Sequence, residues 1–476
     1  MNTAFPIGPV GHLRCRAIPT QATQGSNRTV QQPNRHIAGH NTQRWLIAII
    51  LVSIFGPYVF PSARVRTEQL AIYGCAAISC FLDPRALVSP RRSIRALFVL
   101  WGLIGITASL VTLSNATTGL VWGQFFGGLD HFLSALAVMV VVNAYFWRLE
   151  RSRATLRDEI GFFGRVLIFL LSANTAVELC QLLFGLPFSQ HLSVFWTGHA
   201  YNFSTYITQN AVGVNAVSMG RFTGVFNQPS EQGIAYGAGV ILWLYSFSLG
   251  HRRVVNYLLL SGLLIGGVLG VSKIFLLGCI PLTILYIGYS QVSRTRKSSM
   301  ADFVGLAGAI FVCIAFGLRN ETQSWSGFKE IANLTDYESQ GILSTVTAGR
   351  FHSAGEGAVA EMFRQVWEAH PITGGGFGYL EVSDNAYLHA YMVAGMVGLG
   401  VYLLLLCVLA SPLWVVRVSR IERPRKLLYG ALILFLVGSG MGVPTLSVNR
   451  SATIMWIVVI LLNRDLRLMG KRRRAG

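Results

Sequence analysis

The sequence predicts an all-α membrane protein, a polytopic bundle of about twelve transmembrane helices. Only 12% of its 476 residues are charged, whereas 52% are apolar and the mean hydropathy is +0.50. Soluble domains carry about 25% charged residues. A chain with so few charges cannot cover a water-facing surface, so much of its apolar area must lie against lipid.

The apolar residues are gathered in runs that approach the length of a membrane-spanning helix, which needs about 20 residues to cross about 30 Å of hydrocarbon. Two runs, 256–271 and 452–463, are short, so the number of spans is ten to twelve. Runs 256–271 and 274–290 almost touch, which predicts a tight hairpin around Ser272 and Lys273. The runs are 45–60, 69–83, 96–114, 121–147, 160–185, 232–250, 256–271, 274–290, 303–318, 385–410, 427–442 and 452–463.

The two ends of the chain are polar. No apolar segment of the kind found in a cleavable signal peptide follows the start. We expect a disordered cytoplasmic tail over 1–44, a transmembrane domain over 45–463, and a basic cytoplasmic tail over 464–476 that lies against anionic lipid.

The positions of the Lys and Arg residues support this order of spans. With the N-terminus in the cytoplasm, the inner segments are 1–44, 84–95, 148–158, 251–255, 291–302, 411–426 and 464–476. Most of the 39 Lys and Arg residues then lie on the cytoplasmic side, as the positive-inside rule requires. Those left on the outer side are Arg64, Arg66, Arg221, Lys273, Arg319, Lys329, Arg350, Arg364 and Arg450. One wrong span would exchange the two sides downstream, so the bias also supports cytoplasmic N- and C-termini.

The net charge of +19 does not indicate nucleic-acid binding, because the cations lie in short clusters between apolar runs and form no basic domain. The seven cysteines show no CxxC or Cys/His spacing, and none lies in a large outer loop. The sequence therefore predicts no external disulfide, no metal site and no cofactor.

Two connections on the outer side are long, about 186–231 and 319–384. Long loops on a rigid helical frame are where binding and chemistry usually occur. The second loop contains an amphipathic pattern of about four turns, predicted to lie on the outer membrane surface or over the bundle. Its apolar residues are Val359, Met362, Phe363, Val366 and Trp367.

The first candidate site is the segment 220–233, just before an apolar run. Arg221 at an outer interface would hold a phosphate by bidentate hydrogen bonds. Asn227, Gln228 and Glu231 stand beside it at the mouth of the next helix. The structural alternative is an arginine that extends to the interface and a Pro-Ser-Glu helix start.

The second candidate is the hairpin at Ser272 and Lys273. A lysine between two apolar arms is costly unless it faces water or an anion. The alternative is that Lys273 lies at the level of the outer headgroups and marks the turn.

A third candidate runs from Gly349-Arg350-Phe351-His352 to the glycine-rich segment 371–379. The glycines would let the backbone approach an anionic ligand. A glycine cluster after a helix is also common in ordinary loops. No strand precedes the glycines, so a nucleotide-binding motif is excluded.

The fourth candidate is Ser383-Asp384-Asn385-Ala386-Tyr387-Leu388-His389, at the outer start of the run 385–410. Asp384 is a candidate general base, and His389 lies about one turn further along the helix. Ser-Asp-Asn is also a good helix N-cap.

Three further ionisable residues, Asp130, His131 and Glu178, lie inside apolar runs, where charge is expensive. They are expected to pair with one another or to face a polar cavity. A structural pair is favoured over a catalytic one.

These pieces, in this order, resemble the O-antigen ligase and polymerase family of polytopic enzymes, which includes Wzy-type polymerases and WaaL-type ligases. The resemblance covers about 220–410. Three of the features that carry it are Arg221 through Glu231 before a helix, Ser272-Lys273 at an outer hairpin, and Gly349-Arg350 in a large outer loop. The fourth is the run from Pro371 to Gly378. The fifth is Asp384-Asn385-Ala386-Tyr387-Leu388, which opens a helix that continues through Gly395-Met396-Val397-Gly398-Leu399.

The resemblance implies a fold like that of the GT-C membrane glycosyltransferases. It also implies metal-independent transfer of a glycan from undecaprenyl diphosphate to an acceptor hydroxyl, on the outer face of the bacterial inner membrane. By that resemblance Arg221 and Arg350 would hold the diphosphate, Lys273 would assist, and residues 384–389 would lie near the acceptor. The catalytic candidates are Arg221, Arg350, Asp384 and Glu231; the substrate-binding candidates are Lys273, Asn227, Gln228, Ser272, His352, Asn385, Tyr387 and His389.

The chain departs from the ligase pattern at two places. Ligases usually have His-Asn or His-Ser where Asp384-Asn385 stands, and an acidic residue where Ala394 precedes Gly395. These departures favour a polymerase of O-antigen or exopolysaccharide repeat units over a ligase. Expected partners are the lipid-linked oligosaccharide, membrane lipid, a chain-length regulator and export proteins.

Two other classes of function stay open: a transporter or flippase of lipid-linked oligosaccharide or small anions, and a scaffold for an export complex. Transporters favour broken helices and charges near the midplane. The outer cations of this chain cluster in long loops, which favours an enzyme.

Overall fold

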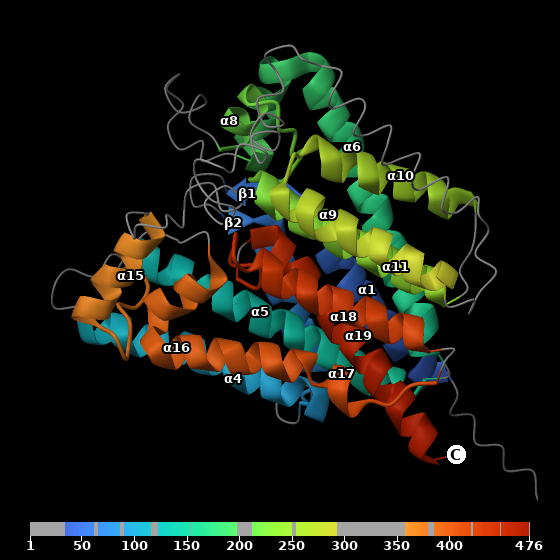
Figure 1. Cartoon of the computed structure of the whole chain (residues 1–476). Helices are drawn as coiled ribbons and strands as arrows, with labels where there is room; N and C mark the ends of the chain where they lie inside the picture. The colour runs from blue at the N-terminus through green and yellow to red at the C-terminus, as the bar shows by residue number, and fades with distance from the viewer. Residues whose placement is uncertain are drawn as a thin grey trace, which may run out of the picture.

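The computed structural model describes residues 34–60, 65–85, 90–115, 122–152, 154–197, 212–249, 254–292, 358–378, 385–419, 422–447 and 449–475 (Figure 1). These ranges are helical almost throughout, which confirms the all-α prediction. The described strands, β1 (Tyr58–Phe60) and β2 (Val65–Arg66), pair with each other antiparallel.

The described helices follow the predicted apolar runs, apart from the run 303–318, which lies outside the described residues. They are α1 (Asn34–Ser53), α2 (Thr67–Leu82), α4 (Arg92–Ser114), α5 (Trp122–Leu149), α6 (Leu156–Leu192), η2 (Ser193–Thr197), α8 (Val212–Ser218), α9 (Pro229–Ser248), α10 (Val254–Leu269), η3 (Ile274–Cys279), α11 (Ile280–Val292), α15 (Ala358–Ala369), α16 (Ala386–Ala410), α17 (Pro412–Val415), α18 (Arg423–Ser439) and α19 (Asn449–Ala475).

Four helical segments of the described chain are long and apolar enough to cross a membrane: Ile94–Ser114, Phe125–Leu149, Leu156–Leu192 and Ala386–Val415. The chain is therefore a membrane protein. Thr67–Leu82, Leu259–Leu269 and Ile274–Tyr286 are apolar but shorter. The total of about twelve spans, and the sides on which the loops lie, stay predictions.

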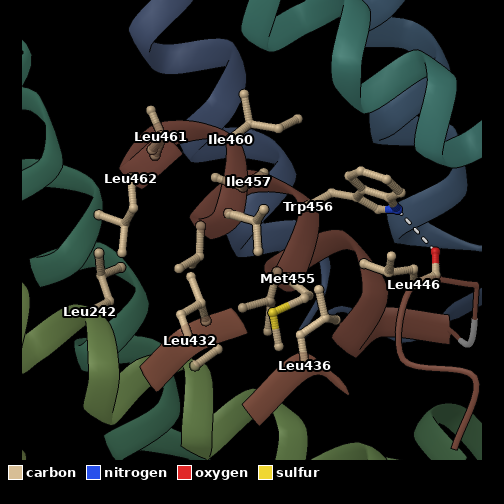
Figure 2. Close-up of a cluster of buried hydrophobic side chains, with 14 of the residues drawn as sticks. Leu242, Leu432, Leu436, Leu446, Met455, Trp456, Ile457, Ile460, Leu461 and Leu462 are labelled. Atoms are coloured by element: carbon tan, nitrogen blue, oxygen red, sulfur yellow. Dashed lines mark hydrogen bonds between the residues drawn. The ribbon is translucent and has the colours of Figure 1, made fainter. Parts of the chain in front are cut away.

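Two helices, α9 and α19, form the centre of the bundle. Every residue of α9 from Glu231 to Ser246 is buried, as is every residue of α19 from Ile454 to Leu462. Figure 2 shows this part of α19 packed with Leu242 of α9 and with Leu432 and Leu436 of α18. Helices that are apolar on every side must be enclosed by other helices. The four long apolar helices α4, α5, α6 and α16 are only partly buried and keep large apolar side chains exposed.

One end of the bundle, called here the arginine end, gathers the segments that the sequence analysis places in the cytoplasm. Ion pairs connect these segments to one another, and the marked C-terminus lies at this end (Figure 1). The connecting pairs are Arg44–Glu159, Arg91–Glu150, Arg157–Glu422, Arg425–Asp465 and Arg464–Glu150. The described parts of the predicted inner segments 84–95, 148–158, 411–426 and 464–476 therefore lie together.

The opposite end, called here the hairpin end, carries β1, β2 and the first turns of α2, α9, α16 and α19 (Figure 1). Helix α15 also lies at this end. Its position at 358–369 confirms the amphipathic helix predicted in the second long loop. The rest of that loop, 319–357, lies outside the described residues.

Several boundaries differ from the sequence-based expectation. Helix α1 begins at Asn34, inside the expected tail 1–44. It ends at Ser53, before the end of the predicted run 45–60, because Gly56 and Pro57 lead into β1. Helix α6 continues to Leu192 past an interruption at Gly185, so the expected loop 186–231 begins as helix. That loop also contains η2 and α8.

Helix α16 is interrupted at Ala394 and Gly395, and the segment 371–377 fills the break. The N–H of Gly375 donates to the Met392 carbonyl at 2.8 Å, and the N–H of Met396 donates to the Pro371 carbonyl at 3.1 Å. Gly395 has a φ of 62°, which favours glycine. The broken backbone thus regains partners from a neighbouring segment, as backbone at membrane depth requires.

The glycines of this segment serve protein packing. A side chain at Gly374 would overlap the backbone of Ala394 and Gly395, and one at Gly376 would overlap Thr112 of α4. The N–H of Phe377 donates to Thr112 Oγ1 at 2.6 Å. The expectation that these glycines bring the backbone to an anionic ligand is wrong for Gly374 and Gly376, because helix backbone occupies that space.

Candidate functional site

A cluster of four buried charged residues lies at the hairpin end. Arg66 immediately precedes α2, Glu68 lies in its first turn, Glu231 lies in the first turn of α9, and Arg450 lies in the first turn of α19. All four side chains are buried. Because buried charges are stable only when they are paired and hydrogen-bonded, the cluster must be a closely fitted arrangement.

Glu231 connects two segments that are distant in sequence. Its Oε1 accepts the backbone N–H of Arg450 at 2.9 Å, and its Oε2 accepts the backbone N–H of Asn227 at 3.0 Å. Pro229 starts α9, where a missing N–H costs nothing. Both carboxylate oxygens thus accept hydrogen bonds from backbone N–H groups, as expected of a side chain that positions the surrounding segments.

Arg450 holds the surrounding loops through its guanidinium. Nη2 donates to the carbonyls of Gly56 and Trp196, each at 3.1 Å, and Nη1 donates to the carbonyl of Val225. One arginine therefore joins the segments before β1, after α6 and before α9. A guanidinium holds five N–H donors in one rigid plane and can therefore reach carbonyls on several sides, whereas an ammonium directs three donors from a single nitrogen.

Arg66 and Glu68 form the second half of the cluster. Arg66 Nη1 lies 3.4 Å from Glu68 Oε2, and Thr453 donates to Glu68 Oε1 at 2.7 Å. Burial lowers the pKa of a guanidinium, but the carboxylates of Glu68 and Glu231 outweigh it and hold the pKa of Arg66 above its usual range. Arg66 is therefore a fixed positive charge.

A small polar cavity adjoins Arg66 and Glu68. Its volume is about 10 Å³, the size needed for about one water molecule. The polar residues that line it are Arg66, Glu68, Gln69, His131, Ser134, Ser447 and Thr453, and Trp456 closes it. The cavity gives His131 a polar setting inside α5.

Asp130, beside His131, is hydrogen-bonded to neutral side chains. Its two carboxylate oxygens accept hydrogen bonds from Gln69 Nε2 and the Tyr73 hydroxyl, both at 2.6 Å. The sequence analysis expects Asp130, His131 and Glu178 either to pair with one another or to face a polar cavity. The expected pairing is wrong for Glu178, which lies in a separate network. A polar cavity is confirmed for His131.

Glu178 is the centre of a buried network of neutral groups on α6 and α9. Its Oε1 accepts from Asn174 Nδ2 at 2.6 Å, Gln232 Nε2 at 2.7 Å and the Tyr236 hydroxyl at 2.9 Å. Its Oε2 is buried and makes no hydrogen bond among the described residues.

The same network holds the turn that follows Arg221. Asn174 Oδ1 accepts the N–H of Val225 at 2.9 Å, and Gln181 Oε1 accepts the N–H of Gly224 at 2.8 Å. A side chain at Gly224 would overlap Asn174, so glycine is required there. Arg221 itself is half-buried, and its N–H donates to the Ala216 carbonyl at 2.8 Å.

The hairpin at Ser272 and Lys273 is present between α10 and η3, as predicted. Ser272 is buried against Gly233 of α9, and Lys273 is half-buried at the start of η3. The N–H of Phe222 donates to the Leu269 carbonyl at 3.0 Å, which places this hairpin next to the Arg221 turn.

Asn385 caps α16, in agreement with the capping alternative. Its Oδ1 accepts the N–H groups of Tyr387 and Leu388 at 2.9 and 3.0 Å. The Tyr387 hydroxyl donates to the Val437 carbonyl at 2.8 Å. His389 is half-buried and interacts electrostatically with His131.

Of the remaining candidate residues, some are described by the structure and others are not. Asn227 donates to Glu231 as described, and Gln228 precedes α9 and accepts a hydrogen bond from Ser230 at 3.2 Å. Arg350, His352 and Asp384 lie outside the described residues. The segment 221–231 and the hairpin 272–273 are thus brought together, whereas the contribution of the second long loop stays a prediction.

Arg66, Glu68 and Arg450 were missed as site residues. Arg66 and Arg450 were among the few cations left on the outer side, which was a usable signal. Glu68 stands directly before the apolar run 69–83, which was a weaker signal. Among the described residues, no group of three or more His, Cys, Asp or Glu side chains lies close enough to hold a metal ion.

Comparison of the sequence with protein-family models and with curated proteins finds no match in either.

Proposed function

We propose that this protein polymerises lipid-linked oligosaccharide repeat units, with undecaprenyl diphosphate as carrier, in O-antigen or exopolysaccharide synthesis. The observation that carries the proposal is the buried cluster of Arg66, Glu68, Glu231 and Arg450 beside a polar cavity, at the end of a membrane bundle opposite the arginine end. The segment 221–231, on which the family resemblance depends, contributes to that cluster.

The reaction needs fixed positive charge next to the bilayer surface. A diphosphate leaving group gathers negative charge as its bond to the sugar breaks, and preorganised cations in a partly dry site stabilise that charge. Arg221 is proposed as the first cation, and the turn that follows it is held by Asn174 and Gln181. Arg350 is proposed as the second cation, and Lys273 lies next to this turn through the α10 hairpin.

The proton of the acceptor hydroxyl needs a base. Asp384 is proposed for this role, because it directly precedes Asn385, whose cap fixes the start of α16. Glu231 is assigned to positioning, since its two oxygens already accept backbone N–H groups. The polyprenyl chain would lie between helices while its diphosphate stays at the hairpin end.

The test is synthesis by purified protein in lipid nanodiscs supplied with undecaprenyl-diphosphate-linked repeat units, with product length read on a gel. Arg221→Ala is expected to reduce chain growth about 100-fold or more, as loss of one charge-stabilising donor does. The matched control is Arg364→Ala, an exposed arginine of α15. Normal long-chain product from Arg221→Ala, or none from wild type, would contradict the proposal.

An O-antigen ligase is the nearest alternative, and the same preparation separates the two. A ligase would transfer the glycan to lipid A-core and would leave repeat units unjoined when that acceptor is withheld. Growth of a ladder from repeat units alone identifies the polymerase.

A proton-coupled transporter or flippase is the second candidate, and one observation favours it. Glu178 is buried in a long apolar helix and has no cation among its described partners, and α6 and α16 are both interrupted by glycine. Ionisable residues and broken helices of this kind are common in transporters. Uptake of the lipid-linked oligosaccharide by proteoliposomes only under a pH gradient would favour this class.

A further inference from the structure

Helix α15 has more apolar surface than the bundle covers. At about 100° per residue, Met362, Phe363, Val366 and Trp367 fall on one face. Val366 is buried against Leu388, Tyr391 and Met392 of α16. Phe363 and Trp367, at the edge of the same face, stay 42% and 53% exposed.

The two exposed rings are held in place. Phe363 stacks on Trp367 with ring centroids 5.9 Å apart, and on Tyr391 of α16 at 4.8 Å. Two large aromatic rings that are both exposed and stacked on each other are unusual on a surface that faces water. This stack therefore points to an apolar surrounding beyond the described residues.

The opposite face of α15 is fully polar. Glu361, Arg364, Gln365 and Glu368 are exposed, and Arg364 pairs with Glu361 at 2.8 Å and with Glu368 at 3.9 Å. Exposed pairs of this kind need water around them. The helix thus separates an aqueous side from an apolar side.

The apolar edge of α15 is continuous with a surface that faces lipid. Ile372, three residues after α15, is 66% exposed, and its carbonyl accepts the N–H of Val397 at 3.4 Å. Met396 and Val397 are exposed on α16. They belong to the segment Ala386–Val415, one of the four long enough to cross a membrane.

The length of that segment places its lipid boundary near the glycine break. At about 1.5 Å per residue, about 20 residues of helix fill the hydrocarbon core, which is about 30 Å thick. Trp414, exposed at the arginine end, marks one boundary, as interfacial tryptophans do. About 30 Å from Trp414 along the helix lies Gly395, so the break lies near the other boundary. Before the break the chain folds back, since Tyr387 contacts Tyr402 with ring centroids 5.7 Å apart, and α15 packs on this returning segment at Leu388, Tyr391 and Met392.

A second aromatic pair lies on the same side of the bundle. Trp122 and Phe126, both exposed at the start of α5, stack with centroids 5.7 Å apart. Phe125, between them, contacts Phe377 of the segment that fills the α16 break. Aromatic residues from α5 and α15 therefore flank the level of Gly395.

We propose that α15 is an interfacial helix that inserts Phe363, Trp367 and Ile372 into the bilayer at the hairpin end. The occupant of the exposed apolar edge is the boundary between headgroups and acyl chains of one leaflet. The polar face with Arg364 lies toward water. This anchoring is independent of any glycan chemistry.

The test is spin-label accessibility in the full-length protein, one copy per lipid nanodisc, in a variant whose native cysteines are replaced by alanine. Phe363→Cys, Trp367→Cys and Ile372→Cys report the apolar edge. Arg364→Cys and Glu368→Cys are matched controls from the polar face of the same helix. Relaxation by oxygen, which concentrates in lipid, is compared with relaxation by a water-soluble nickel chelate.

The expected result is an oxygen-to-nickel ratio several-fold higher at 363, 367 and 372 than at 364 and 368. Equal ratios at all five sites would overturn the proposal. Low access to both agents at 363 and 367 would also overturn it, because a protein surface would then cover the rings. Retention of a single monodisperse species shows that each labelled variant is folded.

Discussion

The carboxylate of Glu231 accepts the backbone N–H of Arg450, 219 residues further along the chain, at 2.9 Å. This bond joins the first turns of the two central helices, α9 and α19. The Arg450 guanidinium then binds three carbonyls on the surrounding segments. The hairpin end is therefore organised by one buried contact, on which both the loops and the proposed site depend.

Replacing Glu231 with alanine is expected to destabilise the protein by about 3–5 kcal/mol, because Arg66 and Arg450 would stay buried without this carboxylate. Glu231→Gln should cost less, since one amide oxygen still accepts an N–H. Thermal unfolding in detergent, followed by circular dichroism, measures both. Glu368→Ala on the exposed face of α15 is the control, with an expected change within about 0.5 kcal/mol. Equal unfolding temperatures for Glu231→Ala and the control would contradict this role.

Local features of this fold were predictable from sequence, and the site cluster was not. The apolar runs, the hairpin at Ser272 and the cap at Asn385 each depend on neighbouring residues, so periodicity and composition predict them. The pairing of Glu231 with Arg450 depends on which helices pack at the centre. Nothing in either local sequence specifies the other.

The glycine segment shows a similar limit. Its composition predicts a loop with unusual backbone angles, and that is what the structure contains. Its partner, the broken backbone of α16 at Gly395, could not be identified because the contact joins two segments through a packed interface. Glycines allow the backbone to approach a ligand closely, and they equally allow it to approach the backbone of another helix. The same glycine-rich sequence is therefore compatible with either partner.

Gly395→Ala is expected to destabilise the protein by about 1–3 kcal/mol, because its φ is positive and a side chain there would overlap the Ile372 carbonyl. Gly400→Ala, on the same helix with open space around it, is the matched control and should be neutral or slightly stabilising. Chemical unfolding of the two variants measures the difference. If both behave alike, the backbone of α16 is not constrained at the break.

Glu178→Gln is expected to be tolerated, whereas Glu178→Ala is expected to lose about 2–5 kcal/mol of stability. The network around Glu178 is neutral, and a buried carboxylate without a cation is costly, so an uncharged side chain of the same shape fits. Alanine would leave Asn174, Gln232 and Tyr236 without their common acceptor. Unfolding temperatures measured in parallel test this, and a Gln variant as unstable as Ala would mean that the negative charge is required.

The hairpin end is expected to face away from the cytoplasm. Helices α8 and α17 lie at opposite ends of the bundle (Figure 1). Met219 is exposed directly after α8, and Arg417 is exposed directly after α17. In a variant without native cysteines, Met219→Cys should react with a membrane-impermeant maleimide in intact cells. Arg417→Cys should react only after permeabilisation, because the positive-inside rule places the arginine end in the cytoplasm. The reverse pattern would put Arg221 and its turn on the cytoplasmic side, and polymerisation on the outer face would then be impossible.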